Sequence, residues 1–295
     1  MTHLIDTIDM EILMHLDAHF AGNFESMLEY YEQDGVGVMP DFEIKEIKRL
    51  QNLEAEEGKS LIETYLPEAA KEITQKAKKL YQELREIYSN KNIRQENILL
   101  SDLILSEEEF PKKEIDAIVQ NGKEIVPLLI NLLSSESFYD PLFPGYGRSP
   151  IFAAKCLGEI QDERAIPPLF EALGHENFFT DEEIIKALSL FGEKSKTFLI
   201  KRLKQGPFSK DNEHAAIALS GFTEDEEIAL SALEVLEKEE TLKRPLFASY
   251  LIFACCELTK SSDQERFITI SKKKDLAKSL QIEMTTVIKT WKEKV

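Results

Sequence analysis

Two histidines four residues apart, His15 and His19, are the first side chains whose types and spacing could do chemistry. On a helix they share one face with Glu11, and imidazoles at positions i and i+4 can hold one metal ion. The zinc-protease pattern requires a glutamate directly after the first histidine, but Leu16 stands there, and no Glu-x-x-His motif completes a dimetal centre. We therefore expect no metal site and no cofactor, and the pair is interpreted as two histidines on an ordinary helix face.

A second candidate is an aromatic segment at residues 134–149, where prolines and glycines interrupt the surrounding helical pattern. Its four rings belong to Phe138, Tyr139, Phe143 and Tyr146. Rigid aromatic side chains provide large contact areas at a low cost in entropy, as binding hot spots require. The sequence predicts either an exposed binding loop or rings that fold back over the helix at residues 126–133.

A third candidate is a group of basic residues in the second half of the chain. Arg164, Lys201 and Arg202 would form a positive spot on the inner, concave surface of a curved helical array, where such arrays bind acidic peptides. Cations also accumulate at helix C-termini, where they complement the helix dipole. Because Lys201 and Arg202 precede Gly206-Pro207, this second interpretation remains open.

No catalytic constellation is found among the other motifs. The segment Gly35-Val36-Gly37 lacks the third glycine of a dinucleotide-binding loop, and Cys156 and Cys255 occupy small-residue positions expected to be buried. We therefore predict no catalytic residues and favour a protein that is not an enzyme.

Composition narrows the class of protein further. The net charge of −18, with no lysine or arginine before Lys45, disfavours nucleic-acid binding because phosphates would be repelled. No apolar run approaches the roughly 20 residues of a membrane-spanning helix. The chain begins with no recognisable export signal, and its three cysteines suggest no disulfide framework. These features predict a cytoplasmic protein without membrane contact.

The elements that must position these residues all follow a helical period. Apolar residues step by three and four from residue 66 to residue 87, which predicts one long amphipathic helix. Shorter helices are expected at residues 4–20, 24–33 and 42–57. We group residues 1–105 as an acidic N-terminal helical domain.

The second half of the chain repeats itself. Residues 156–160, 187–191 and 218–222 align at a spacing of 31, and residues 125–133 align with 165–173 at a spacing of 40. Repeats of this length indicate stacked units of two amphipathic helices, neither of which can bury its apolar stripe alone.

The segment AAKCLGEIQDERAIPPLFEAL, residues 153–173, closely resembles the HEAT repeat, in particular the short bacterial form that also occurs in phycobilin lyases. The resemblance extends over about residues 111–258. It implies an all-α fold, an α-α superhelix or HEAT-like solenoid, over residues 106–295, with a basic C-terminal capping helix. The HEAT-like deoxyhypusine hydroxylases carry several His-Glu pairs, whereas this chain has one, His175-Glu176, so that chemistry is not expected.

These patterns predict a non-catalytic, bacterial-type module or adaptor for protein–protein interaction. Its partner would be another protein, bound through residues 134–149 or through the concave face. A homodimer held by the helix at residues 66–88 is possible. The alternative function is a metal- or cofactor-binding, lyase-like enzyme, based on His15, His19 and the resemblance to lyase repeats.

Overall fold

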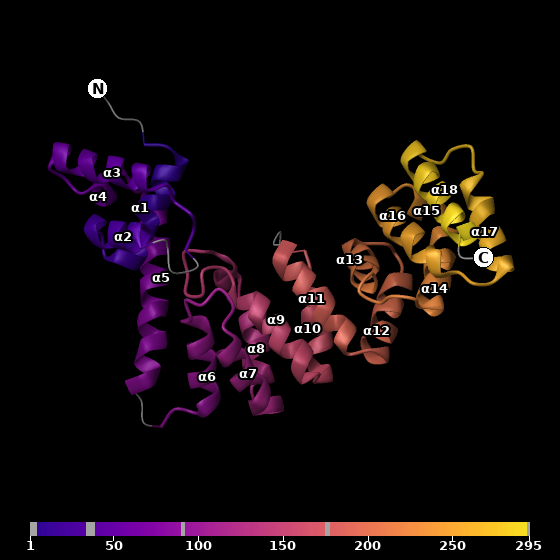
Figure 1. Cartoon of the computed structure of the whole chain (residues 1–295), viewed down its shortest axis with the longest axis horizontal. Helices are drawn as coiled ribbons and strands as arrows, with labels where there is room; N and C mark the ends of the chain where they lie inside the picture. Colours follow the sequence, from indigo (N-terminus) through magenta and orange to yellow (C-terminus); the bar gives the residue numbers. More distant parts are fainter. Residues whose placement is uncertain (1–4, 34–38, 90–91, 175–177, 294–295) are drawn as a thin grey trace. The chain divides into compact units, whose positions relative to one another are not determined.

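The architecture is helical throughout the part of the chain that the structure describes (Figure 1). This computed structural model describes residues 5–33, 39–89, 92–174 and 178–293. All of its regular elements there are α-helices or short 3-10 helices. The all-α prediction is therefore confirmed. The segment Gly35-Val36-Gly37 and the pair His175-Glu176 lie outside the described residues.

The chain divides into two compact units, residues 1–156 and 157–295. The division falls inside one helix and not at 105/106, where the sequence places its domain boundary. The physical reason lies in residues 134–149, because Leu142 and Phe143 pack in one cluster with Ala77 and Met14 of the N-terminal helices. The first helices of the expected array thus belong to the same unit as the acidic N-terminal region.

Unit 1 begins with helices that surround one apolar core. The helices of the unit are α1 Thr7–Phe20, α2 Phe24–Glu32, α3 Ile44–Glu57, α4 Leu61–Tyr65, α5 Glu68–Glu86, α6 Gln95–Ile104, α7 Lys112–Asn121, α8 Val126–Leu133 and α9 Ser149–Ile160, which runs into unit 2. Asp6 and Asp9 form a capping box at the start of α1. Asp9 is buried and pairs with Arg49 of α3, so this ion pair ties the first helix to the third.

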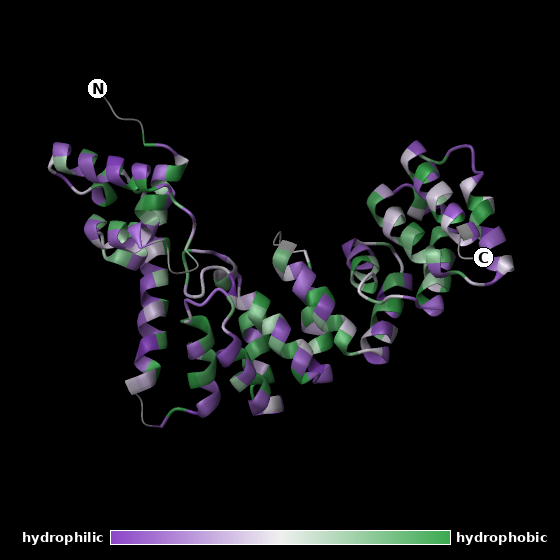
Figure 2. Cartoon of the chain, in the orientation of Figure 1, coloured by the Kyte–Doolittle hydropathy of each residue, from purple (hydrophilic) through white to green (hydrophobic). Residues whose placement is uncertain are grey.

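The long helix predicted at residues 66–87 is present, with one difference at its start. Pro67 is the N-cap of α5, and the preceding turn forms a separate helix, α4. A proline fits this junction because its missing N–H would have no partner at the beginning of a helix. Figure 2 shows α5 as mainly hydrophilic along its length. Its buried positions are Ala70, Thr74, Ala77 and Leu84, which lie on one face.

Unit 2 stacks its helices in two rows. Its helices are α10 Ile166–Glu171, α11 Phe178–Leu190, α12 Glu193–Lys204, α13 Lys210–Leu219, α14 Glu226–Leu236, α15 Glu239–Leu242, α16 Pro245–Ala254, α17 Ser261–Ser271 and α18 Lys278–Glu293. Helices α11, α13, α16 and α18 contact one another in turn, and α12, α14 and α17 form the second row. Each helix therefore covers its apolar stripe with a neighbour from the same row and one from the other.

Small residues allow successive helices of one row to approach closely. A Cβ atom on Gly158 would lie 2.7 Å from Cα of Ala187, and one on Gly221 would lie 2.7 Å from Cγ2 of Ile185. Cys156 and Cys255 are buried, as predicted from their small-residue positions, and burial raises the pKa of the Cys255 thiol. The repeated small residues thus mark the contacts between neighbouring units.

Helix α18 packs one face against the rest of unit 2. Met284 and Val287 are fully buried, and the indole N–H of Trp291 donates to the carbonyl oxygen of Cys256 at 3.1 Å. The Trp291 ring also meets Phe267 edge-on, with centroids 5.2 Å apart. The basic side chains of α18 therefore sit on a helix whose other face is committed to the core.

The contact at Gly158 generates a prediction about stability. Gly158→Val introduces atoms where the Ala187 backbone lies, so we expect the free energy of unfolding to fall by about 1–3 kcal/mol. Ser220 occupies the corresponding position two repeats later and is exposed. Urea denaturation followed by circular dichroism should therefore show Ser220→Val close to the unmodified protein. Equal behaviour of the two variants would refute the close-approach explanation.

Candidate functional site

The aromatic segment at residues 134–149 is folded back onto helices α1 and α5 of unit 1. Phe143 and Tyr146 are only 8% exposed each. The expectation that these two rings are displayed on an exposed loop is therefore wrong. They are buried because the apolar faces of α1 and α5 are not fully covered by the first four helices, and Leu142 and Phe143 complete that cover beside Ala77.

The other two rings of the segment, Phe138 and Tyr139, are half-buried. The Tyr139 hydroxyl donates to the carbonyl oxygen of Leu133 at 2.8 Å, which ties the segment to the end of α8. Gly147 approaches the Tyr139 backbone so closely that a Cβ atom on Gly147 would lie 2.9 Å from the Tyr139 carbonyl oxygen. The backbone φ angle of Gly147 is +74°, which favours glycine. The segment is thus packed into the fold. It is tied to α8, the helix over which it was predicted to fold, and it also contacts the N-terminal helices.

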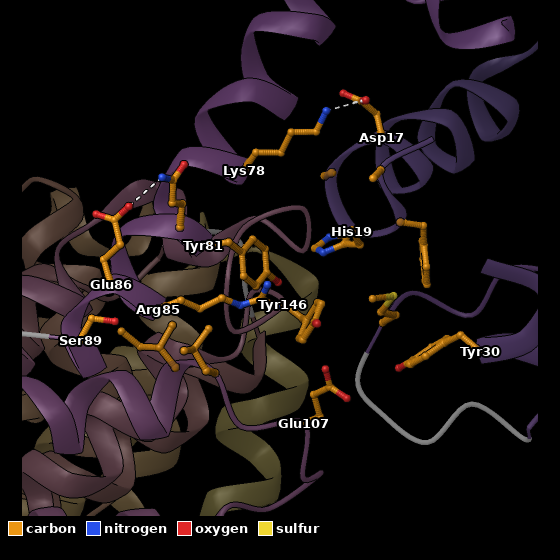
Figure 3. Close-up of a pocket in the computed structure, with 17 residues that line it drawn as sticks. Asp17, His19, Tyr30, Lys78, Tyr81, Arg85, Glu86, Ser89, Glu107 and Tyr146 are labelled. Atoms are coloured by element: carbon orange, nitrogen blue, oxygen red, sulfur yellow. Dashed lines mark hydrogen bonds and ion pairs between the residues drawn. The ribbon is translucent and has the colours of Figure 1, made fainter. Parts of the chain in front are cut away.

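A cavity of about 870 Å³ opens beside this segment within unit 1 (Figure 3). The end of α1 contributes His19 and α2 contributes Tyr30 to its lining. Helix α5 supplies Tyr81 and Arg85, and the folded-back segment supplies Tyr146. Glu107, just after α6, completes the polar lining. His19 of the histidine pair and Tyr146 of the aromatic segment therefore meet at one site.

Of the two histidines, His19 lines the cavity, and its ring stacks on that of His15, which does not line it. Their ring centroids are 5.2 Å apart, and His19 also lies 5.3 Å from the Tyr81 ring and 5.4 Å from the Tyr146 ring. Burial lowers the pKa of His15 to about 4. Burial, reinforced by the nearby His15, lowers the pKa of His19 to about 3, although a hydrogen bond with the Leu142 backbone opposes that shift. Both imidazoles are therefore neutral at physiological pH.

The surroundings of the pair do not resemble a metal centre. His15 meets Phe42 edge-on, with ring centroids 5.3 Å apart, so aromatic rings occupy the positions next to the imidazoles. Within the described ranges, no three histidine, cysteine, aspartate or glutamate side chains are grouped so that they could hold an ion. A metal would have to be held by two imidazoles without a carboxylate or thiolate from those ranges.

The walls of the cavity combine tyrosines with two opposite charges. Burial raises the pKa of Tyr146 to about 12, and the carboxylate of Glu107 acts in the same direction. The Arg85 guanidinium lies over the Tyr81 ring, 5.9 Å from its centroid. Lys78 is already paired with Asp17 at 2.6 Å, as the dashed line in Figure 3 shows. The tyrosines therefore remain protonated, and Arg85 and Glu107 provide the charges that face the cavity.

The fold leaves some polar atoms beneath the cavity wall without partners. His15 Nδ1 and His19 Nε2 are buried and make no hydrogen bond with a described residue, whereas the buried Tyr81 hydroxyl interacts with that of Tyr146. A buried polar atom without a partner costs about 1–3 kcal/mol. The demand for hydrogen bonds at this site is thus not met by the protein groups that the structure describes.

The predicted basic spot consists of cations with local partners. Arg164 pairs with Asp162 at 2.9 Å, in the turn before α10. Arg202 stacks over the rings of Phe170 and Phe198, 5.4 and 5.2 Å from their centroids. Lys201 is exposed on α12. Arg164 therefore makes a local ion pair within its turn, and Arg202 of α12 contacts Phe170 of α10.

Unit 2 carries a separate apolar surface along α16. Leu246 and Phe253 are 63% and 52% exposed, and Tyr250 lies between them on the same helix face. A groove of about 440 Å³ runs beside Tyr250 and Phe253 towards Phe222, which follows α13. Glu224 and Glu257 also line it. We call this combination the α16 groove.

Several residues of the cavity carry only a weak signal in the sequence. Tyr81 and Arg85 stand four residues apart on the predicted long helix and so share a helix face. Tyr30 and Glu107 have no motif around them. They could not be found from sequence because tertiary packing alone brings them beside His19.

The packing of the aromatic segment predicts that Phe143 is structural. Replacing a buried phenylalanine by alanine costs about 3–5 kcal/mol, so Phe143→Ala should lower the urea midpoint of unfolding markedly. Phe110 is 52% exposed and serves as the matched position. We expect Phe110→Ala to change the midpoint only slightly, and a Phe143→Ala protein as stable as Phe110→Ala would contradict the burial.

The histidine pair predicts a dependence of stability on pH. The folded-state pKa values of His15 and His19 lie below the usual 6.5, so the unfolded chain binds more protons as the pH falls below 6.5. The free energy of unfolding should therefore decrease from pH 6.5 towards pH 4. His15→Phe should flatten this decrease, whereas Tyr81→Phe, which retains both imidazoles, should preserve it. Identical pH profiles for the unmodified protein and His15→Phe would rule out the buried neutral imidazole.

Comparison with known proteins identifies the repeats. A family model described as HEAT repeats matches residues 149–220, which run from the start of α9 to the end of α13. A search of curated proteins gives no match. Along the described helices, none has the length and apolar character that crossing a membrane requires. Two rows of stacked helices, small residues at their contacts and this match agree with one another, and the chain is a HEAT-like helical repeat protein.

Proposed function

We propose that this protein is a non-catalytic module that binds another protein through its helical array. HEAT repeats typically serve as scaffolds for protein interaction, because stacked helices present extended surfaces. The observation that carries the proposal is the α16 groove, where the aromatic side chain of Phe253 is half exposed on the same helix as the exposed Leu246. An exposed aromatic residue beside a pocket is the usual form of a binding hot spot.

The chemistry of the α16 groove favours a particular kind of partner segment. Its floor is apolar, with Tyr250, Phe253 and Phe222, while Glu224 is exposed at its edge. Asp225 is already engaged, since it caps α14 and pairs with Lys196 at 3.1 Å. The groove therefore suits a segment with an apolar anchor next to a lysine or arginine that pairs with Glu224.

The proposal also includes further candidate contact residues, a location and an oligomeric form. The positive side chains Arg164, Lys201 and Arg202 remain candidates for contacts with acidic residues of a partner. In the aromatic segment only Phe138 and Tyr139 retain partial exposure and stay candidates. A cytoplasmic location is consistent with three cysteines that are free thiols. A homodimer would be one form of protein partner, detectable by equilibrium sedimentation.

Affinity capture with matched variants tests the groove. We expect the unmodified protein and Phe110→Ser to retain the same partner, and Phe253→Ser to lose it, because Phe110 and Phe253 are equally exposed at 52%. Glu224→Gln should weaken capture at low salt more than at high salt, since salt screens exposed charges. Retention by Phe253→Ser would exclude the groove, and a partner segment without basic residues would exclude the proposed chemistry.

A further inference from the structure

The cavity of unit 1 has features that the protein-binding proposal does not use. Its volume of about 870 Å³ lies in the range of small-molecule sites, and every residue that lines it belongs to residues 1–156. The α16 groove lies in the other unit. The two sites can therefore be tested independently.

Some of the charged side chains that line the cavity have partners, whereas Arg85 and Glu107 are not paired with each other. Lys78 is satisfied by Asp17, and Glu86 accepts a hydrogen bond from Gln82 at 2.7 Å. Arg85 and Glu107 form no ion pair with each other or with another of the described residues. In Figure 3 both side chains point towards the space between Tyr81, Tyr146 and Tyr30. One positive and one negative group thus face the same cavity across an aromatic lining.

Arg85 and Glu107 both affect the pKa values of Tyr81 and Tyr146. The pKa of the buried Tyr146 hydroxyl is pushed upwards by the Glu107 carboxylate and downwards by the Arg85 guanidinium. The same opposed influences reach Tyr81. A ligand in contact with Tyr81 and Tyr146 would therefore feel both charges.

These features select the charge type of a ligand. A simple anion would satisfy Arg85 and leave Glu107 facing it, in a chain whose net charge is already −18. A simple cation would satisfy Glu107 and be repelled by Arg85. A zwitterion satisfies both, because carboxylates form strong charge-assisted hydrogen bonds with guanidinium groups and ammonium groups form them with carboxylates.

The rings select the body of the ligand. Tyr30, Tyr81, Tyr146 and His19 line the cavity with aromatic surface, which favours an aromatic side chain by stacked or edge-to-face contact. The Tyr81 and Tyr146 hydroxyls interact with each other at this wall, and each phenol oxygen can take part in more than one hydrogen bond. A peptide group can both donate and accept.

We propose that the cavity between α1, α5 and Tyr146 binds a short zwitterionic peptide with an aromatic side chain. Arg85 receives its carboxylate, Glu107 receives its ammonium group, and the tyrosines hold the ring. His19 is a positioning residue: it packs against Tyr81 and Tyr146 and orients their rings.

Calorimetry with three probes tests this assignment on the full chain. The probes are the dipeptide alanyl-phenylalanine, its C-terminal amide and its N-acetyl form. We expect the free dipeptide to bind at least about tenfold more tightly than either blocked form, a factor that corresponds to one lost charge-assisted contact.

Variants then assign each end of the peptide. Arg85→Met should abolish the difference between the dipeptide and its amide, and Glu107→Gln should abolish the difference between the dipeptide and its acetylated form. Lys79 is 78% exposed on α5 and does not line the cavity, so Lys79→Met is the matched control and should retain both differences. A thermal scan checks that each variant is folded.

Several results would overturn the proposal. They are the absence of binding heat at millimolar dipeptide, equal affinity for the free and blocked probes, or the same loss in Lys79→Met as in Arg85→Met. None of them depends on the capture experiment, because Phe253 and the α16 groove are unchanged in these variants. Failure of the peptide site and failure of the protein-binding function are therefore distinguishable.

Discussion

The constraint on which this structure depends is that no single helix can bury its own apolar face. In unit 2 the constraint is met by neighbours, since α13 and α16 contact each other, α13 also contacts α12, and α16 also contacts α14. Gly158 and Gly221 allow the helices to come close enough for this burial. In unit 1 the helices at the start of the chain need additional cover, and residues 134–149 provide it. The same requirement thus produces a regular stack in one unit and a folded-back segment in the other.

Much of the fold could be predicted from the sequence because the relevant signals are local. The periodic apolar positions located α1, α2, α3 and α5 to within a few residues, and the 31-residue spacing located the stacked pairs. The separate helix α4 was not anticipated, because the apolar period was followed only from residue 66, and the expected long helix therefore included Pro67. A proline fits both the N-cap and the first turn, so only the backbone geometry distinguishes them.

The site could be predicted only in part, because it depends on contacts between distant segments. His15 and His19 were identified from their spacing, and Tyr146 from its aromatic neighbours. Neither pattern carries information about the other, so the contact between the His19 and Tyr146 rings could not be predicted from the sequence. The sequence left open whether the aromatic segment is exposed or folded back, because composition describes what a ring can do and not which surface it covers; Phe143 and Tyr146 are buried. In the structure, one residue of each candidate, His19 and Tyr146, lines the same cavity.

The origin of the cavity walls has a consequence for the synthesis of the chain. His19, Tyr81 and Tyr146 come from three segments separated by more than sixty residues each, and the last lies near the middle of the sequence. Until the residues around 146 have left the ribosome, the α1 and α5 surfaces have no cover from this segment. The nascent N-terminal half therefore exposes apolar surface for part of its translation. Completion of the cavity coincides with the moment at which that surface is withdrawn from water and from chaperones.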